Sequence, residues 1–389
     1  MNELNNMLST LLRSVICGER LDQNELEGLD VESIDKLYKL SKANDMAHVV
    51  GLALNNAGLL NDERTTEKFT KHQLVAVHRY ENTIYEQDRI FTVLNEHKIP
   101  FIPLKGSIIR ELYPEPWMRT SCDIDVLVKE SDVDRAAEAL AASLGYEIDP
   151  RKSVHDILLK AESGVQLELH YNLNEGIQSI DRVLKRVWEY ASATQNGSEY
   201  RLTDEFFMYH FIAHASYHFV NGGCGFRTIC DMWLLMQSDR YDKEKLLDLC
   251  RDGGVETLYL ALSRLAEAWF GKREHDPTTK RMEKYIVFGG TYGISESKIA
   301  ARREARGGKI GYLLSRVFVS YRHLKFKYPS LKTRALVPVY QVRRWIDMLR
   351  EKKLSKYAGE FNTNQSLSDE KIAEVCSLMR DLDLNKMIK

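Results

Sequence analysis

The segment from Cys122 to Val128 alternates polar and apolar side chains, which is typical of a half-buried β-strand. Asp123 and Asp125 are two residues apart, so their carboxylates leave the same face of the strand, roughly 6–7 Å apart along the backbone. Ile124 and Val126 point to the opposite face. The fold must therefore give this strand an apolar core on one side and a polar site on the other. Paired carboxylates are ligands that hard cations such as Mg2+ prefer.

The residues before this strand predict a strand, a sharp turn and a short helix. An apolar run that contains Ile102 and Leu104 ends at Gly106. An amphipathic segment then begins at Ser107 and is stopped by Pro114, because proline cannot continue a helix. The predicted turn between strand and helix thus lies just before the acidic strand in the sequence.

A third acid is expected beside the aspartate pair. Residues 157–160 and 165–170 alternate around a Gly-containing turn at 162–164, which predicts a β-hairpin. In its second strand Glu168 and His170 share one face. An acid on a cleanly alternating strand is the partner that the two aspartates need, so we predict that Glu168 completes an acidic metal site.

The distribution of periodic patterns predicts the fold class. Helical spacing covers the N-terminal residues and returns after residue 200, whereas the segment between them mixes strands and helices. We predict an α+β protein with a small mixed β-sheet core flanked by mainly α-helical N- and C-terminal regions. The expected boundaries are a helical region at 1–97, the sheet-containing core at 98–200, a helical region with a basic segment at 201–356, and a linker with a terminal helix at 357–389.

Composition indicates a cytoplasmic protein with reduced cysteines. The six cysteines include no C-x-x-C pair, so neither a disulfide framework nor a zinc knuckle is expected. No window approaches about 18 uninterrupted apolar residues, and the polar N-terminus lacks the features of a signal peptide. We therefore expect no transmembrane segment.

The net charge of −1 hides a strongly basic segment near the C-terminus. Between Lys298 and Lys356 there are seventeen Lys or Arg residues against three acids, with aromatic residues interleaved. Three interpretations fit this pattern. The segment is a solvated helical face, a contact for a polyanion such as RNA, or a surface that is attracted to an anionic membrane.

The aromatic-rich segment from Phe206 to Val220 carries three histidines at intervals of four, namely His210, His214 and His218. This spacing places them on one helix face and suits metal ligation. No cysteine or acid stands at a matching offset, however, and the face can equally line an interface with the core.

Several runs spread over most of the chain form one larger pattern. They are Leu104-Lys105-Gly106-Ser107, Leu112-Tyr113-Pro114, Arg119, Asp123-Ile124-Asp125-Val126-Leu127-Val128, Leu167-Glu168-Leu169-His170, and a helix with His214 and His218 followed by Arg227 and Asp231. Together they resemble the uncharacterised nucleotidyltransferase family of the DNA polymerase beta superfamily. The resemblance is most specific over residues 103–130. The stretch between Ser107 and Asp123 is longer than in minimal superfamily members, which suggests an added loop over the site.

The resemblance implies a nucleotidyltransferase-type fold and the transfer of a nucleoside monophosphate from an NTP to an acceptor, with Mg2+ or Mn2+ as cofactor. Asp123 and Asp125 would bridge two metals, and Glu168 would bind the catalytic metal and orient the proton of the acceptor hydroxyl. Gly106 would let the backbone approach a phosphate, and Ser107 would offer donors to it. His214 would lie near the bound nucleotide or the acceptor.

The basic residues near this motif have two interpretations each. Lys105 and Arg119 would either neutralise the β- and γ-phosphates or form structural ion pairs. Arg110 is predicted to be solvated, and Arg227 and Asp231, four residues apart, are predicted to pair on one helix.

The acceptor stays open between a small molecule, a sugar, a protein side chain and RNA. Two alternative functions also remain. One is a non-catalytic nucleotide-binding or regulatory module with the same fold. The other is an RNA-directed, toxin-like nucleotidyltransferase that the basic segment would serve.

Overall fold

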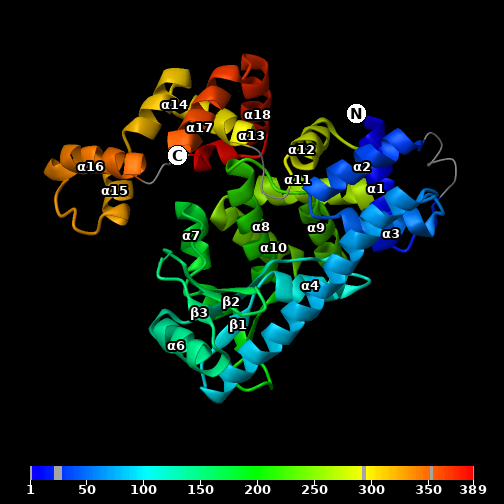
Figure 1. The fold of residues 1–389 in the computed structure, drawn as a ribbon, viewed down its shortest axis with the longest axis horizontal. Coiled ribbons are helices and arrows are strands. Elements are labelled where there is room, and N and C mark those ends of the chain that lie inside the picture. Colours follow the sequence, from blue (N-terminus) through cyan, green and yellow to red (C-terminus); the bar gives the residue numbers. More distant parts are fainter. Residues whose placement is uncertain (1, 22–28, 152, 291–294, 351–353, 389) are drawn as a thin grey trace. The chain divides into compact units, whose positions relative to one another are not determined.

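A computed structural model describes residues 2–21, 29–151, 153–290, 295–350 and 354–388 (Figure 1). Residues 351–353, which belong to the basic segment, lie outside the described residues. The chain forms two compact units, Met1–Tyr217 with Cys224–Thr291 and His218–Gly223 with Tyr292–Lys389. The first unit contains the sheet, and the described part of the second is helical. The predicted α+β class, with helical regions on both sides of a central sheet, is confirmed.

Four helices precede the sheet, namely α1 (Asn2–Ile16), α2 (Val31–Ala43), α3 (Ala47–Asn56) and α4 (Glu63–Glu96). The side chains of Asp30 and Asp62 each accept a backbone N–H three residues further on and so cap α2 and α4. Gly51 allows α3 to approach α4 closely, because a Cβ at this position would lie 2.7 Å from the Cβ of Phe69.

The central sheet has five strands in the order β1-β2-β5-β4-β3. Its strands are β1 (Phe101–Pro103), β2 (Asp123–Val128), β3 (Glu147–Ile148), β4 (Asp156–Lys160) and β5 (Gln166–His170). The β2 and β5 strands run parallel, whereas the other neighbouring pairs are antiparallel. The predicted hairpin is therefore confirmed as β4–β5, and Gly164 in its turn adopts the left-handed conformation with φ 85°.

Strand alternation separates the two faces of the sheet. Ile124 and Val126 of β2 join Leu167 and Leu169 of β5 in one core, which α4 and α6 (Val133–Leu144) cover. Asp125 leaves the opposite face, as the alternation predicted.

The short helix expected after the turn at Gly106 is a single α-helical turn, α5 (Gly106–Ile109), which tightens into η2 (Arg110–Leu112). A 3-10 turn, η4 (Glu130–Asp132), precedes α6, and no side chain caps this helix. Gly145 ends α6 in the left-handed conformation, with φ 71°.

The first unit continues with α7 (Gln178–Leu184), η5 (Val187–Tyr190), β6 (Ala191–Ala193), β7 (Tyr200–Leu202), α8 (Asp204–Val220), α9 (Arg227–Gln237), α10 (Lys243–Gly253), α11 (Glu256–Phe270) and α12 (Pro277–Val287). Gly254, with φ 73°, ends α10 and so separates it from α11.

The second unit contains α13 (Ser295–Ala305), α14 (Gly308–Val317), α15 (Tyr321–Lys327), η6 (Arg334–Leu336), α16 (Val337–Arg350), α17 (Leu354–Ser366), α18 (Asp369–Asp381) and η7 (Leu384–Met387). The linker expected from residue 357 begins within a helix, α17. This helix packs on α14, and Glu360 of α17 forms an ion pair with Arg316 of α14. Among the described residues, no helix is long and apolar enough to cross a bilayer.

A buried carboxylate ties α4 to the far edge of the sheet. Glu86, only 2% exposed, accepts hydrogen bonds from Arg89 (2.9 Å), from the hydroxyl of Tyr146 (2.7 Å) and from Ser163 in the β4–β5 turn (2.7 Å). Three donors thus share one acid at the place where α4 meets the sheet.

Replacing Glu86 by Ala should lower the free energy of unfolding by about 2–3 kcal/mol, because buried donors lose their acceptor. Urea denaturation of the variant beside Glu81→Ala, an exposed acid on the same helix, measures the effect. Equal stabilities of the two variants would contradict the role given to Glu86.

Candidate active site

Three acidic side chains meet because β2 and β5 are adjacent and parallel. Their register pairs Asp125 with Glu168 and places Asp123 one step before this pair on the same face. His170 follows on β5, and its Nε2 donates a hydrogen bond to Oδ1 of Asp125 at 2.9 Å and lies 3.5 Å from Oε2 of Glu168. The potential ligand atoms of Asp125, Glu168 and His170 all lie within 4.8 Å of one another.

The pKa values within this acid cluster diverge for identifiable reasons. Burial, followed by the nearby charges of Asp125 and Glu168, raises the pKa of Asp123 to about 6. Burial would also raise the pKa of Asp125, but the charge of Lys105 and the hydrogen bond from His170 hold it well below its usual range. Burial opposes protonation of His170, yet its bonds to the carboxylates raise its pKa to about 9. The two carboxylates therefore favour the protonated form of His170.

Lys105 lies at the turn between β1 and α5, with a strained backbone. Its φ of 31° falls in the left-handed region, which side chains other than glycine rarely adopt. Its positive charge lowers the pKa of Asp125 and, further along the chain, of Glu175, so the turn brings an ammonium group to the acids. Two residues on, the hydroxyl of Ser107 is buried and has no hydrogen-bond partner among the described residues.

The loop after β5 and helix α8 bring a second acid–histidine pair near the cluster. Nδ1 of His214 lies 2.9 Å from Oε1 of Glu175. Burial would raise the pKa of Glu175, but His214 lowers it to about 2. The charge of His214 also lowers the pKa of Asp125, so His214 lies close enough to interact electrostatically with the acid cluster. One turn earlier, burial and Lys105 push the pKa of His210 well below its usual value.

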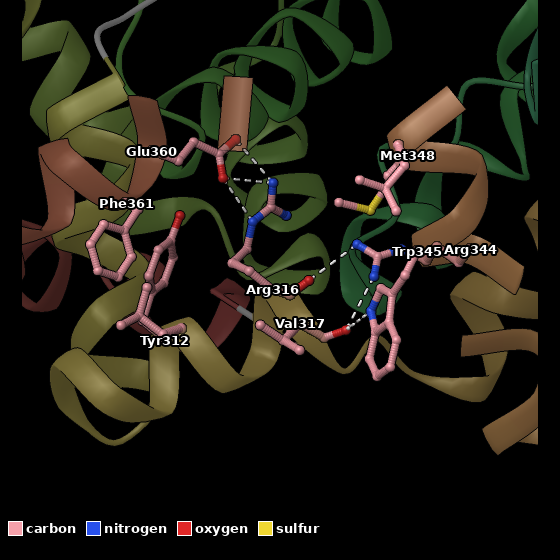
Figure 2. A pocket seen from close by; sticks show the side chains of 10 residues that line it. Tyr312, Arg316, Val317, Arg344, Trp345, Met348, Glu360 and Phe361 are labelled. Carbon is pink, nitrogen blue, oxygen red and sulfur yellow. Dashed lines mark hydrogen bonds and ion pairs between the residues drawn. The ribbon is translucent and has the colours of Figure 1, made fainter. Parts of the chain in front are cut away.

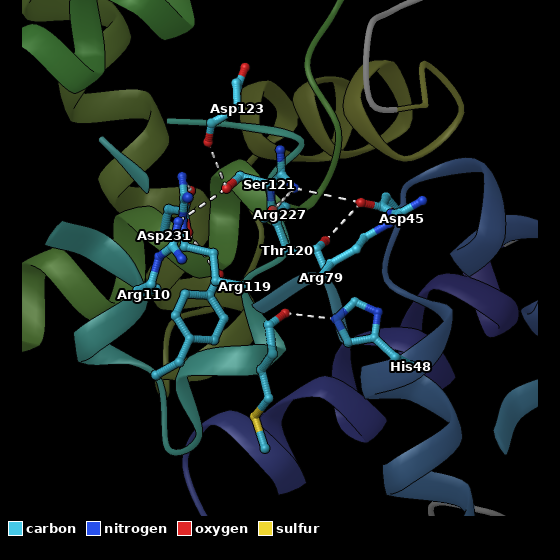
Figure 3. Close-up of polar contacts among 12 residues, drawn as sticks. Asp45, His48, Arg79, Arg110, Arg119, Thr120, Ser121, Asp123, Arg227 and Asp231 are labelled. Atoms are coloured by element: carbon cyan, nitrogen blue, oxygen red, sulfur yellow. Dashed lines mark hydrogen bonds and ion pairs between the residues drawn. The ribbon is translucent and has the colours of Figure 1, made fainter. Parts of the chain in front are cut away.

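Arg119 is held in a buried ion pair. Its Nε and Nη2 donate to the two carboxylate oxygens of Asp231 at 2.9 and 3.0 Å (Figure 3). The hydroxyl of Tyr113 donates to the same acid at 2.8 Å. Arg119 and Asp231 are 8% and 3% exposed. Of the two interpretations that the sequence left for Arg119, the structure supplies the contacts of a structural ion pair.

The predicted pair between Arg227 and Asp231 is wrong, because Asp231 is already taken by Arg119. Arg227 instead donates to the carbonyl of Thr120 at 2.7 Å and lies 4.0 Å from Asp45 (Figure 3). Its positive charge opposes part of the rise in the pKa of Asp123 on β2. Helix α9 therefore supports the loop that leads into β2.

Arg110 is buried and not solvated, contrary to expectation. It is 1% exposed and donates to the carbonyl of Gly106 (2.8 Å) and to Oγ of Ser121 (3.1 Å), which in turn donates to the carbonyl of Asp123 (3.1 Å). A Cβ at Gly106 would lie 3.2 Å from Nη1 of Arg119 and 3.4 Å from Nη2 of Arg110. The missing side chain thus makes room for two guanidinium groups as well as exposing backbone.

The structure brings together five residues that the sequence analysis singled out, namely Asp123, Asp125, Glu168, Lys105 and His214. The sequence analysis gave no role to His170 or Glu175. The alternation of β5 had placed His170 on the acidic face, so that signal was available. Glu175 lies in a loop without periodicity, and no spacing linked it to the histidines of α8.

A family profile described as uncharacterised nucleotidyltransferase matches residues 30–271. This span contains every residue of the site described above. No curated protein and no solved structure matches the chain.

Replacing Asp231 by Ala should destabilise the protein by about 3–5 kcal/mol, because Arg119 would stay buried without its acid. Chemical denaturation measures the loss. The double change Arg119→Met/Asp231→Leu should recover much of the stability, since it removes both charges. A stable Asp231→Ala protein would contradict the structural role of this ion pair.

A second prediction concerns pH, through His48 on α3. Its Nε2 donates to the carbonyl of Met118 in η3 (Pro116–Met118) at 2.8 Å (Figure 3), and burial lowers its pKa from 6.5 to about 4. Between these values the unfolded chain binds a proton that the folded protein does not, so stability should fall by about 3 kcal/mol as the pH drops from 6.5 to 4.

Unfolding free energies of wild type and His48→Gln across this pH range test the prediction. The variant can still donate to Met118 but cannot titrate, so its stability should depend less on pH. His78→Gln, which changes an exposed histidine on α4, should behave like the wild type. Identical pH profiles for wild type and His48→Gln would contradict the prediction.

Proposed function

Since the chain belongs to the family of uncharacterised nucleotidyltransferases, we propose that it transfers a nucleoside monophosphate from an NTP to an acceptor hydroxyl or similar group. The acceptor oxygen would form a bond to the α-phosphorus while the bond to the bridging oxygen breaks, so pyrophosphate leaves with the electron pair. The observation that supports this proposal most is the convergence of Asp123, Asp125 and Glu168 on one face of adjacent parallel strands.

The donor set of this acid cluster fits divalent metal ions such as Mg2+ or Mn2+, which favour carboxylate oxygens. Asp123 carries a raised pKa partly because Asp125 and Glu168 crowd negative charge around it, and a divalent cation would offset that charge. Asp123, Asp125 and Glu168 would hold the ions. When bound, two such ions supply charge stabilisation to the attacking and leaving oxygens of an in-line displacement.

The remaining groups of the site have roles that follow from their positions. Lys105 carries its charge beside the acids, where it would neutralise phosphate oxygens of the nucleotide. The buried hydroxyl of Ser107 is a donor that a phosphate would satisfy. His170 would fix the orientation of Asp125 through their 2.9 Å hydrogen bond.

Glu168 is suited to the acceptor side of the reaction. Its side chain is 37% exposed, compared with 10% for Asp125, so an acceptor hydroxyl can reach it. As a carboxylate it would accept or orient the proton of the attacking hydroxyl. His214, paired with Glu175, would contact the nucleotide or the acceptor from α8.

Calorimetry with each of the four NTPs, in the presence of Mg2+ or Mn2+, tests this assignment. Wild type should bind at least one NTP in a metal-dependent manner. The double variant Asp123→Asn/Asp125→Asn should lose most of that binding, by roughly a hundredfold or more, because neutral amides bind divalent cations poorly. Release of pyrophosphate on incubation with candidate acceptors would separate an enzyme from a non-catalytic binding module.

A matched control is Glu138→Gln/Glu162→Gln, which removes two exposed negative charges from α6 and the β4–β5 turn of the same unit. It should bind NTP like the wild type. No NTP binding by folded wild type, or equal binding by both double variants, would contradict the proposed function.

A further inference from the structure

The second unit contains a helix whose amphipathic character is inverted. Helix α16 buries Gln341 and Arg344, which are 5% and 3% exposed. Its aliphatic side chains face solvent instead, with exposed fractions between 43% and 62%. They are Val339, Val342, Ile346 and Leu349. A helix in water normally does the reverse, so this arrangement needs a reason.

The buried polar side chains are held by the C-terminal end of α14 and the residues that follow it. Arg344 donates to the carbonyls of Arg316 and Val317, both at 3.1 Å (Figure 2). Gln341 donates to the carbonyl of Val319 at 2.6 Å. A cation at these carbonyls also interacts favourably with the negative end of the helix dipole. The polar side of α16 is therefore fixed inward, and its aliphatic side is forced outward.

Helix α14 and the residue after it expose a second apolar stripe. Its members are 45% to 72% exposed and recur at helical spacing. They are Ile310, Leu314, Val317 and Phe318. Val317 of this stripe and Leu349 of α16 line one cavity of about 480 Å³. Tyr312, Trp345 and Phe361 also line it, and Figure 2 shows them with Val317. The two stripes and this cavity form one apolar surface, here called the α14–α16 face.

Positive charge borders one edge of the α14–α16 face. At 100° per residue, Arg343 and Arg350 fall along the edge of the aliphatic stripe of α16, and both are exposed. They belong to the segment in which seventeen Lys or Arg residues stand against three acids. The face is thus apolar at its centre and cationic along this edge of α16.

We propose that the α14–α16 face docks on an anionic lipid bilayer. Such a surface accepts both halves of the pattern, because aliphatic side chains enter the headgroup boundary while Lys and Arg meet anionic lipids. This inference does not depend on the proposed transferase reaction. Its residues also lie beyond the span that the family profile matches.

The chemistry of the face argues against two other occupants. A second copy of the chain in a two-fold contact would bring the same basic segment against itself, and like charges would oppose it. RNA would satisfy the positive charges but leave the aliphatic side chains in water, because single strands stack on aromatic rings. A bilayer leaves neither group without a partner.

Co-sedimentation of the full-length protein with vesicles tests the proposal. One set of vesicles is phosphatidylcholine alone, and the other contains roughly one quarter phosphatidylglycerol. Wild type should bind the anionic vesicles at least about tenfold more tightly than the neutral ones. Failure to bind the anionic vesicles would overturn the proposal.

Two variants separate the apolar from the electrostatic contribution. Val342→Asp/Ile346→Asp should lower binding to anionic vesicles by about tenfold or more, because it places charge in the aliphatic stripe. Arg343→Glu/Arg350→Glu should lower it by at least about 25-fold, since each cation near the surface contributes about fivefold. Both variants alter exposed positions, and their circular dichroism should match that of wild type.

Leu74→Asp, which changes an exposed leucine of α4 in the first unit, is the matched control and should bind like wild type. Vesicle binding that survives Val342→Asp/Ile346→Asp would overturn the proposal, because charge alone would then explain it. A wild-type dimer that this variant converts to a monomer in light scattering would assign the face to a second copy and would likewise overturn it.

Discussion

The parallel pairing of β2 with β5 is the constraint on which the acid site depends. This register sets Asp125 directly beside Glu168 and puts Asp123 one step away on the same face. A slip of one residue would turn the carboxylates of one strand into the apolar core and break the site. The aliphatic residues between the acids, which pack under α4 and α6, therefore hold the register that creates the polar face.

Three neighbouring carboxylates repel one another, and nearby cationic and hydrogen-bonding groups reduce this repulsion. The charge of Lys105 and the hydrogen bond from His170 favour the ionised form of Asp125, whereas the pKa of Asp123 is raised. The loop from residue 107 to 121 is anchored by a separate set of buried cations. Arg119 reaches across to Asp231 on α9, and Arg110 returns to the backbone of its own turn.

The two units differ in the chemistry of their surfaces. The first contains the sheet, the acid cluster and most of the residues that match the family profile. The second is helical and basic, and it turns aliphatic side chains outward because the polar side of α16 binds the end of α14. Because Arg344 binds carbonyls at the end of α14, the opposite, aliphatic side of α16 is left exposed for a partner.

The sequence by itself determined the α+β class, the β4–β5 hairpin and the opposite faces of Asp125 and Ile124. These features follow from local periodicity, because alternation fixes the direction of a side chain wherever the strand lies. Only the tertiary structure decided the partners of the buried charges. Arg119 pairs with an acid 112 residues away, Arg110 is buried although its helix position suggested solvent, and Glu175 meets His214 from an irregular loop. Such pairs depend on how elements distant in the sequence pack together, and residue spacing along the chain does not predict that packing.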